Sequence, residues 1–244
     1  MLISLDRASH RSSHLSTTQP SRLHRIVRHI SFQTMMCGLA LGALCIVGQT
    51  RADAQAQVVT AFDRQLSRLD LAVSGAGYFN TKTSGNNYLG QPLVNDPGNT
   101  LGAIVTIRYT ARPYVGFEFN YGYARFTQNF SSIGGVQSNA NEYTVGYVAH
   151  PGFSVFGLQP FAAIGAGSIA NKPTPGGGQG LQEQARAAYY YGVGVDDLYF
   201  GPHFGFRGQF RQLISLAPDY GQNYLTIKKR TITSEPAFGI FLKF

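Results

Sequence analysis

Most of the chain from Leu69 to the C-terminal Phe244 consists of short segments in which large apolar residues alternate with small or polar ones. Alternation at every second position is typical of β-strands, because successive side chains point to opposite faces of a sheet. The clearest segment runs from Tyr114 to Phe126. Eight such segments can be counted, so the sequence predicts an all-β domain of eight strands over residues 67–244.

The connections between these segments alternate in length. Short ones follow the second, fourth and sixth segments, at residues 110–113, 150–156 and 196–201. Long ones follow the odd-numbered segments, at residues 81–100, 127–141, 168–184 and 212–231. Short turns on one side and long loops on the other are typical of antiparallel barrels that cross a membrane.

The two faces of the predicted strands differ in chemistry. One is aromatic and aliphatic, and the other carries Gly, Ala, Thr, Asn and ionisable residues. In a transmembrane barrel the apolar face meets lipid, and eight strands leave room inside only for small or mutually packed side chains. The sequence therefore predicts an eight-stranded antiparallel transmembrane β-barrel. A soluble, lipocalin-like barrel that binds a ligand in its interior is the alternative fold interpretation.

Ionisable side chains on the small-residue face are expected to meet in the lumen, because charges survive inside a membrane only when paired or hydrated. We expect Glu118 and Glu142 to pair with Arg108, Arg207 or Arg211 across it. Such a network would be a plug of ion pairs or a charge-selective gate, and the narrow lumen favours the plug. The predicted lumen residues are Arg108, Glu118, Glu142, Arg186, Arg207 and Arg211.

Residues 1–54 have the features of a secretory signal peptide with a long basic n-region. The apolar run Met35–Gly48 is too short to span a bilayer, and a small-x-small site at Ala52 and Ala54 follows it. Both cysteines lie in that run, so no disulfide is expected after cleavage. Residues 55–66 would then form an N-terminal stub on the periplasmic side.

The segments Gln159–Gly167, Gly192–Asp196, Pro202–Arg207 and Gly239–Phe244 resemble the outer membrane protein A (OmpA)-like family of eight-stranded porin-type barrels. The resemblance implies a monomer in the bacterial outer membrane, inserted by the barrel-assembly machinery, with a structural or surface-recognition role. A small diffusion pore is the alternative function. The terminal strand resembles the family's insertion signal, with Phe238, Gly239, Ile240, Leu242 and Phe244.

One basic cluster suggests a partner. Lys228, Lys229 and Arg230 are predicted to lie where the last long loop re-enters the barrel, at the outer-leaflet boundary. They would contact lipopolysaccharide phosphates or form a cationic collar at the membrane edge. The net charge of the residues after position 54 is only weakly positive, and the basic residues are spread along the sequence. This does not indicate a nucleic-acid partner.

The sequence offers little for catalysis or metal binding. His150 and His203, the histidines after position 54, each lie beside a proline at a short turn, and neither belongs to a Ser-His-acid pattern. Asp196 and Asp197 are predicted to form a turn rather than a Ca²⁺ site, which needs six or more oxygen ligands. We therefore expect no enzyme activity, no metal and no cofactor, with an envelope enzyme as a less favoured alternative.

Overall fold

The computed structural model describes residues 60–197 and 203–244. The predicted signal peptide, with Ala52 and Ala54, lies outside these residues, as does the first part of the predicted stub. The described chain begins with helix α2 (Ala61–Leu66), which starts with a capping box: the Thr60 hydroxyl accepts from the Asp63 amide at 3.2 Å, and the Asp63 carboxylate accepts from the Thr60 amide at 2.9 Å.

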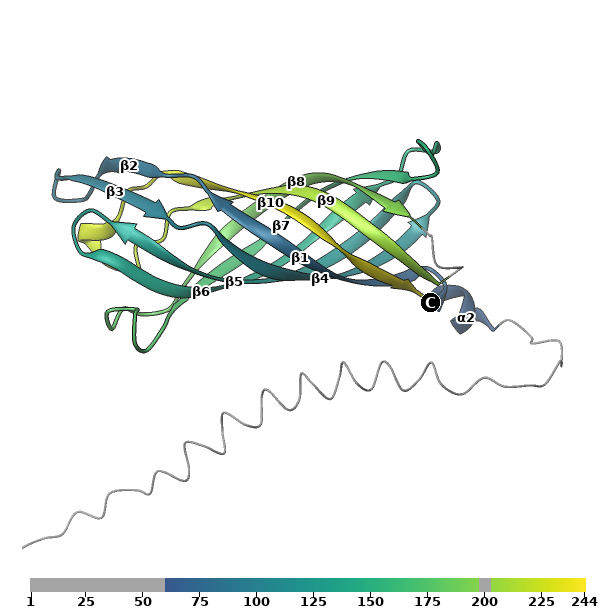
Figure 1. The fold of residues 1–244 in the computed structure, drawn as a ribbon, viewed down its shortest axis with the longest axis horizontal. Coiled ribbons are helices and arrows are strands. Elements are labelled where there is room, and N and C mark those ends of the chain that lie inside the picture. The colour runs from purple at the N-terminus through teal and green to yellow at the C-terminus, as the bar shows by residue number, and fades with distance from the viewer. Residues whose placement is uncertain (1–59, 198–202) are drawn as a thin grey trace, which may run out of the picture. The chain divides into compact units, whose positions relative to one another are not determined.

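Ten strands follow, and eight of them form the wall of a barrel (Figure 1). The wall strands are β1 (Leu69–Asn80), β4 (Thr100–Arg112), β5 (Val115–Phe130), β6 (Gly134–Ala149), β7 (Gln159–Pro173), β8 (Gln184–Asp197), β9 (Phe204–Leu216) and β10 (Arg230–Lys243). The other two, β2 (Thr83–Asn86) and β3 (Pro92–Pro97), form a hairpin beyond the end of β1.

The sheet closes on itself, because β1 pairs antiparallel with both β4 and β10 while β5 pairs with β6. Each wall strand is thus hydrogen-bonded to its two neighbours, and no free edge remains in the wall. The eight predicted strands and the closed antiparallel barrel are confirmed. Helix α2 and the C-terminus lie at the short-turn end of the barrel, and the β2–β3 hairpin lies at the long-loop end (Figure 1).

At the long-loop end the strands continue well beyond their predicted limits. Residues 127–141 were expected to form a long loop, but β5 runs to Phe130 and β6 begins at Gly134, so that prediction was wrong. The two strands stay in register up to the pair Phe130–Gly134, and β3 pairs with β5 from Asn95 opposite Phe130. Hairpin pairing of β5 with β6, joined by β3 on the other edge of β5, extends the sheet where the sequence is too polar for alternation to predict it.

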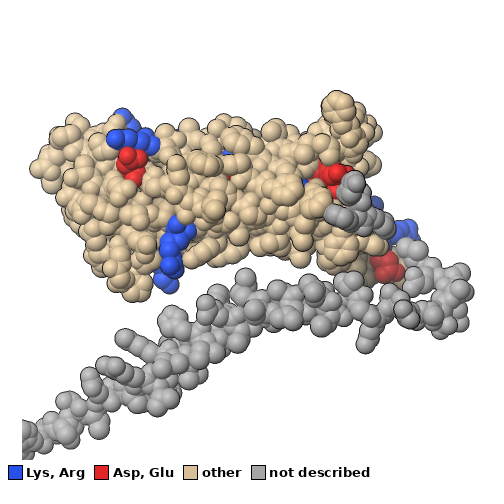
Figure 2. All heavy atoms as spheres, viewed as in Figure 1, with Lys and Arg blue, Asp and Glu red and all other residues tan. Residues whose placement is uncertain are grey.

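The outer surface of the wall is an apolar belt. Aromatic and aliphatic side chains are exposed on every wall strand, including Val73, Leu101, Phe117, Val145, Ile164, Tyr189, Phe210 and Phe238. In Figure 2 charged side chains gather near the two ends of the barrel, and the middle of the visible face is almost free of them. This is the inside-out arrangement of a transmembrane barrel, as predicted. Among the described helices, none is long and apolar enough to cross a membrane.

The lumen is more apolar than the sequence suggested. Two buried clusters from several strands surround and separate the ion pairs, from Phe161 beside Arg108 to Ala140 and Phe126 toward the long-loop end. They contain Ala76, Tyr78, Ile104, Ala124, Ala140, Val148, Phe161, Ala163, Ile169, Ala188, Tyr190, Leu213 and Ala237, with Phe126 against both. The interior is therefore a packed core with embedded charges.

Small residues of the wall make room for this core. A Cβ added to Gly146 would collide with the Tyr190 hydroxyl and the Ile164 carbonyl oxygen, whereas one added to Gly208 would meet only Val195 and Phe238 at 3.8 and 3.9 Å. Gly146 thus admits the buried Tyr190 ring, whereas a Cβ at Gly208 would be at ordinary van der Waals distance from its neighbours.

We predict that Gly146→Ala lowers the free energy of unfolding by about 1–3 kcal/mol, because it overpacks the lumen. Gly208→Ala, the matched control, should change it by less than about 0.5 kcal/mol. Urea titration of the protein in detergent micelles, followed by the unboiled gel band, measures both. Equal midpoints for the two variants would contradict this account of Gly146.

Candidate functional site: the ion-paired lumen and its outer cap

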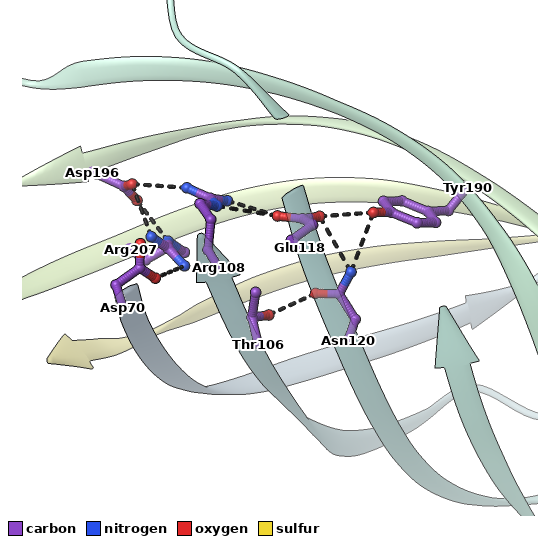
Figure 3. A network of polar contacts seen from close by, with 8 residues as sticks. All are labelled: Asp70, Thr106, Arg108, Glu118, Asn120, Tyr190, Asp196 and Arg207. Carbon is purple, nitrogen blue, oxygen red and sulfur yellow. Dashed lines mark hydrogen bonds and ion pairs between the residues drawn. The ribbon is translucent and has the colours of Figure 1, made fainter. Parts of the chain in front are cut away.

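A first charge network crosses the lumen near the short-turn end (Figure 3). Arg108, from β4, lies between Glu118 at 2.9 Å and Asp196 at 3.0 Å. Arg207, from β9, lies between Asp196 at 2.7 Å and Asp70 at 3.0 Å. Asp196 therefore bridges the two arginines, and strands β1, β4, β5, β8 and β9 are linked through one chain of charges.

Neutral side chains extend the network toward the middle of the barrel (Figure 3). The second oxygen of Glu118 accepts hydrogen bonds from the Tyr190 hydroxyl at 2.9 Å and the Asn120 amide at 3.2 Å. The Asn120 oxygen in turn accepts from the Thr106 hydroxyl at 2.7 Å. Both oxygens of Glu118 are thus hydrogen-bonded. This matters for stability, because a buried polar group without a partner costs free energy.

Aromatic rings fill the space around the arginines. The Arg108 guanidinium lies 4.2 Å from the centroid of the Phe161 ring, and that of Arg207 lies 5.0 Å from the Phe241 ring. Phe241 belongs to the terminal strand but points inward, opposite to its neighbours Ile240 and Leu242. The two rings, held against the arginines by cation–π contacts, thus fill the part of the lumen through which ions would otherwise pass.

A second network lies closer to the middle. Arg211, on β9, contacts Glu142 of β6 at 2.9 Å and Glu235 of β10 at 2.5 Å. Thr144 donates to Glu142 at 3.0 Å, and the Arg211 guanidinium lies 5.2 Å from the Tyr190 ring. Arg211 is 1 % exposed and Glu235 is fully buried. Tyr190 therefore contacts both networks, with its hydroxyl on the first and its ring on the second.

The structure brings together five of the six predicted lumen residues. Glu118 pairs with Arg108 and Glu142 with Arg211, as expected, whereas Arg207 pairs with two aspartates instead of a glutamate. The sixth, Arg186, lies near the long-loop end and pairs with Asp219 at 2.7 Å.

Three carboxylates of these networks were not predicted: Asp70, Asp196 and Glu235. Each occupies an inward position of its strand, so strict alternation from the neighbouring inward residues would have found it. Asp196 was interpreted as a turn residue, which was wrong. Strand β8 continues through it, because Asp196 is in register with Gln159 and with Arg207.

A folded segment caps the lumen at its long-loop end. Residues 217–229, between β9 and β10, place Tyr220, Leu225 and Ile227 against inward residues of the barrel extension. The resulting buried cluster contains Leu93, Phe130, Val136, Tyr220, Leu225 and Ile227. The Tyr220 hydroxyl also lies 3.3 Å from the Ser138 hydroxyl of β6. We call residues 217–229 the outer cap.

Asp219 fastens the outer cap to β8. Its carboxylate accepts from the Gln184 amide at 2.6 Å, the Gly221 amide at 3.0 Å and the Thr226 hydroxyl at 2.9 Å, and it pairs with Arg186. Partial burial raises the pKa of Asp219, but these hydrogen bonds and the Arg186 charge outweigh burial, so that pKa lies below its ordinary value.

The remaining predicted residues lie outside the lumen. Lys228, Lys229 and Arg230 are exposed where the outer cap joins β10, and the Lys228 ammonium lies 4.2 Å from the centroid of the Tyr88 ring. On β10, Phe238 and Ile240 are exposed on the apolar belt, as is the terminal Phe244.

The two histidines lie near the short-turn end. His203 Nδ1 lies 3.1 Å from the Lys243 carbonyl oxygen. Partial burial and the nearby Arg108 charge lower the pKa of His150, whose Nδ1 has no hydrogen-bond partner. Over residues 60–197 and 203–244, no group of three or more His, Cys, Asp or Glu side chains is placed to hold a metal ion.

The fold and the lumen together define a closed eight-stranded membrane β-barrel with a filled interior, the fold that the OmpA-like resemblance predicted. Comparison with family models and with curated proteins found no match. Solved structures that the chain is similar to include Neisserial surface protein A, with 11 % identity, a TM-score of 0.48 and coverage of 72 % of this chain and 97 % of that one.

A second similar structure is Ail of Yersinia pestis in complex with the heparin analogue sucrose octasulfate, with 14 % identity, a TM-score of 0.43 and coverage of 72 % and 99 %. A third is the N-terminal barrel of OprF from Pseudomonas aeruginosa, with 15 % identity, a TM-score of 0.40 and coverage of 72 % and 97 %. At such identities and scores, the description of this chain rests on its own geometry.

Replacing Arg211 by Met should lower the free energy of unfolding by about 3–5 kcal/mol, because Glu142 and Glu235 would be left buried without a counter-charge. Lys82→Met is the control: its pair with Asp96 spans 3.9 Å and is well exposed, so we expect less than about 0.5 kcal/mol. Urea titration in micelles gives both values. The triple variant Arg211→Met/Glu142→Gln/Glu235→Gln should recover most of the loss, and no recovery would refute the charge explanation.

Asp219→Asn should loosen the outer cap and speed trypsin cleavage after Lys228, Lys229 and Arg230 several-fold, with Asp96→Asn as the control. A carboxyl whose pKa is lowered on folding contributes stability above its ordinary pKa of about 3.9 and loses it as pH falls through the lowered value. The contribution of Asp219 should therefore be constant from pH 5 to 8. Unchanged cleavage of the variant at pH 7 would contradict this role.

Proposed function

We propose that this protein is an integral protein of the bacterial outer membrane, with a structural or surface-recognition role carried out by its long-loop end. The single observation that carries the proposal is that the barrel has an apolar outer surface and a filled lumen. A soluble ligand-binding barrel would bury its large apolar side chains inside, whereas here Phe117, Val145, Phe210 and Phe238 are exposed.

The occupied lumen favours this role over a diffusion pore. From the short-turn end, a solute would meet the Arg108–Arg207 network with the Phe161 ring against it, then the Arg211 network among the apolar clusters, and finally the outer cap. Moving an ion through apolar layers of this kind is costly. We therefore infer a non-conducting protein.

The two ends of the barrel suggest its orientation. The long-loop end carries more basic than acidic residues, and the phosphates of lipopolysaccharide in the outer leaflet are a matching partner. The basic residues are Lys82, Arg125, Lys172, Arg186, Lys228, Lys229 and Arg230, and the acidic ones are Asp96, Glu183 and Asp219. We infer that this end faces outward, with Lys228, Lys229 and Arg230 in contact with those phosphates, and that the short-turn end is periplasmic.

Insertion would follow the route suggested by the C-terminal strand. The outward residues Phe238, Ile240, Leu242 and Phe244, with Gly239 between them, match the pattern that the barrel-assembly machinery reads in related barrels. Because the wall has no free edge and its apolar belt faces lipid, a monomer satisfies its own backbone hydrogen bonds.

In planar lipid bilayers the purified protein should give no stable single-channel steps, because several layers of side chains fill the lumen. Replacing residues 218–228 with a short Gly-Ser loop should leave it closed, since the two ion-pair networks remain. On gels of isolated outer membranes, the band should change mobility on boiling. Regular ohmic steps would establish a pore, and a periplasmic protein with no mobility change would refute the membrane assignment.

A further inference from the structure

A polar groove lies on the outside of the wall, at the long-loop end. Its volume is about 530 Å³, within the range of small-molecule sites. The outward faces of β5 and β6 form its floor, and the start of the β7–β8 loop forms its side. It is lined by Arg125, Thr127, Gly135, Gln137, Asn139 and residues 174–177.

The groove is preformed, because hydrogen bonds fasten the β7–β8 loop onto β6. Gln137 donates its amide to the Gly177 carbonyl and accepts from the Thr174 amide, each at 2.9 Å. The Gln179 side chain donates to the carbonyls of Ile133 at 3.0 Å and Gly135 at 2.8 Å. A ligand would therefore not have to order this wall on binding.

Two uncompensated positive charges border the groove. Arg125 donates through Nε to the Asn139 oxygen at 2.7 Å, and Asn139 is in register with Arg125 on one side and Lys172 on the other. The three form a row across β5, β6 and β7, and both basic residues are exposed. Over residues 60–197 and 203–244 neither forms an ion pair, so an anion supplied by a ligand would meet no competing carboxylate.

The position of this row along the barrel axis indicates whether the ligand is a membrane lipid or a soluble molecule. Below it lie three outward tyrosines, of which Tyr121 and Tyr143 pack with centroids 5.2 Å apart. Tyr121 donates to Asn141 at 3.0 Å and Tyr123 to Asn139 at 3.2 Å. Outward tyrosines with bonded hydroxyls mark the membrane–water interface. The groove thus opens sideways into the head-group layer, rather than over the lumen.

We propose that this groove binds the phosphorylated saccharide head group of a glycolipid in the outer leaflet, a proposal that rests on the membrane assignment above. Arg125 and Lys172 contact its phosphate, and the side chains of Gln137, Asn139 and Thr127 form hydrogen bonds with sugar hydroxyls. The acyl chains lie along the apolar belt below the tyrosines. The lateral opening favours a lipid-borne saccharide over a soluble anionic one. This site is separate from Lys228, Lys229 and Arg230, which adjoin β10.

The test compares lipid binding by the full-length mature protein and by Arg125→Gln/Lys172→Gln. The probe is diphosphoryl lipid A in detergent micelles, measured by native mass spectrometry. Phosphatidylglycerol supplies an anionic lipid without a sugar, and glucosamine 6-phosphate supplies a soluble sugar phosphate. Arg112→Gln is the control for the loss of an exposed charge, because Arg112 ends β4 at the short-turn end of the barrel, away from the groove.

The double variant should bind lipid A about 25-fold more weakly, since each basic residue at an anionic membrane surface contributes about fivefold. Arg112→Gln should bind as the parent does, and the parent should prefer lipid A to both other probes. Equal binding by parent and double variant would overturn the site, and equal binding of phosphatidylglycerol would overturn the saccharide. Either failure, with the heat-modifiable band retained, would leave the membrane assignment standing.

Discussion

The neutralisation of buried arginine charge is the constraint on which the rest of this structure depends. Arg108, Arg207 and Arg211 are each at most 1 % exposed inside a narrow wall, where an unpaired charge would cost several kcal/mol. Their partners come from β1, β5, β6, β8 and β10, so charge pairing ties together strands that are distant around the wall. The glycines opposite Tyr190 follow from the same requirement, since its hydroxyl completes the shell of Glu118.

The interior of the barrel is filled with side chains, like the core of a globular protein, although it also contains buried charges. Charged and apolar layers succeed one another along the axis, and the outer cap closes the wide end with its own small core. A lumen filled in this way links the strands of the wall through buried side-chain contacts as well as through their backbone hydrogen bonds. Stability, rather than passage, explains why so many large side chains point inward in so narrow a barrel.

The outside divides into three zones with different chemistry. The apolar belt meets lipid, the tyrosines near Tyr121 mark its upper boundary, and a basic zone with a side groove lies beyond. The groove exists only because β5 and β6 continue past the belt and the β7–β8 loop folds back on them. The extension of the hairpin therefore forms the surface at which we propose that head groups bind.

The sequence by itself determined the eight wall strands and their two faces, because a period of two is a local property of any strand, but it did not indicate the β2–β3 hairpin or the full length of β5 and β6. It also placed Arg108, Glu118, Glu142, Arg207 and Arg211 on the inner face. Only the tertiary structure decided which charges meet: Asp70, Asp196 and Glu235 reach their partners through the register of strands that pair around the closed barrel. The outer cap and the side groove likewise arise from contacts between segments that are distant in sequence, which no local pattern encodes.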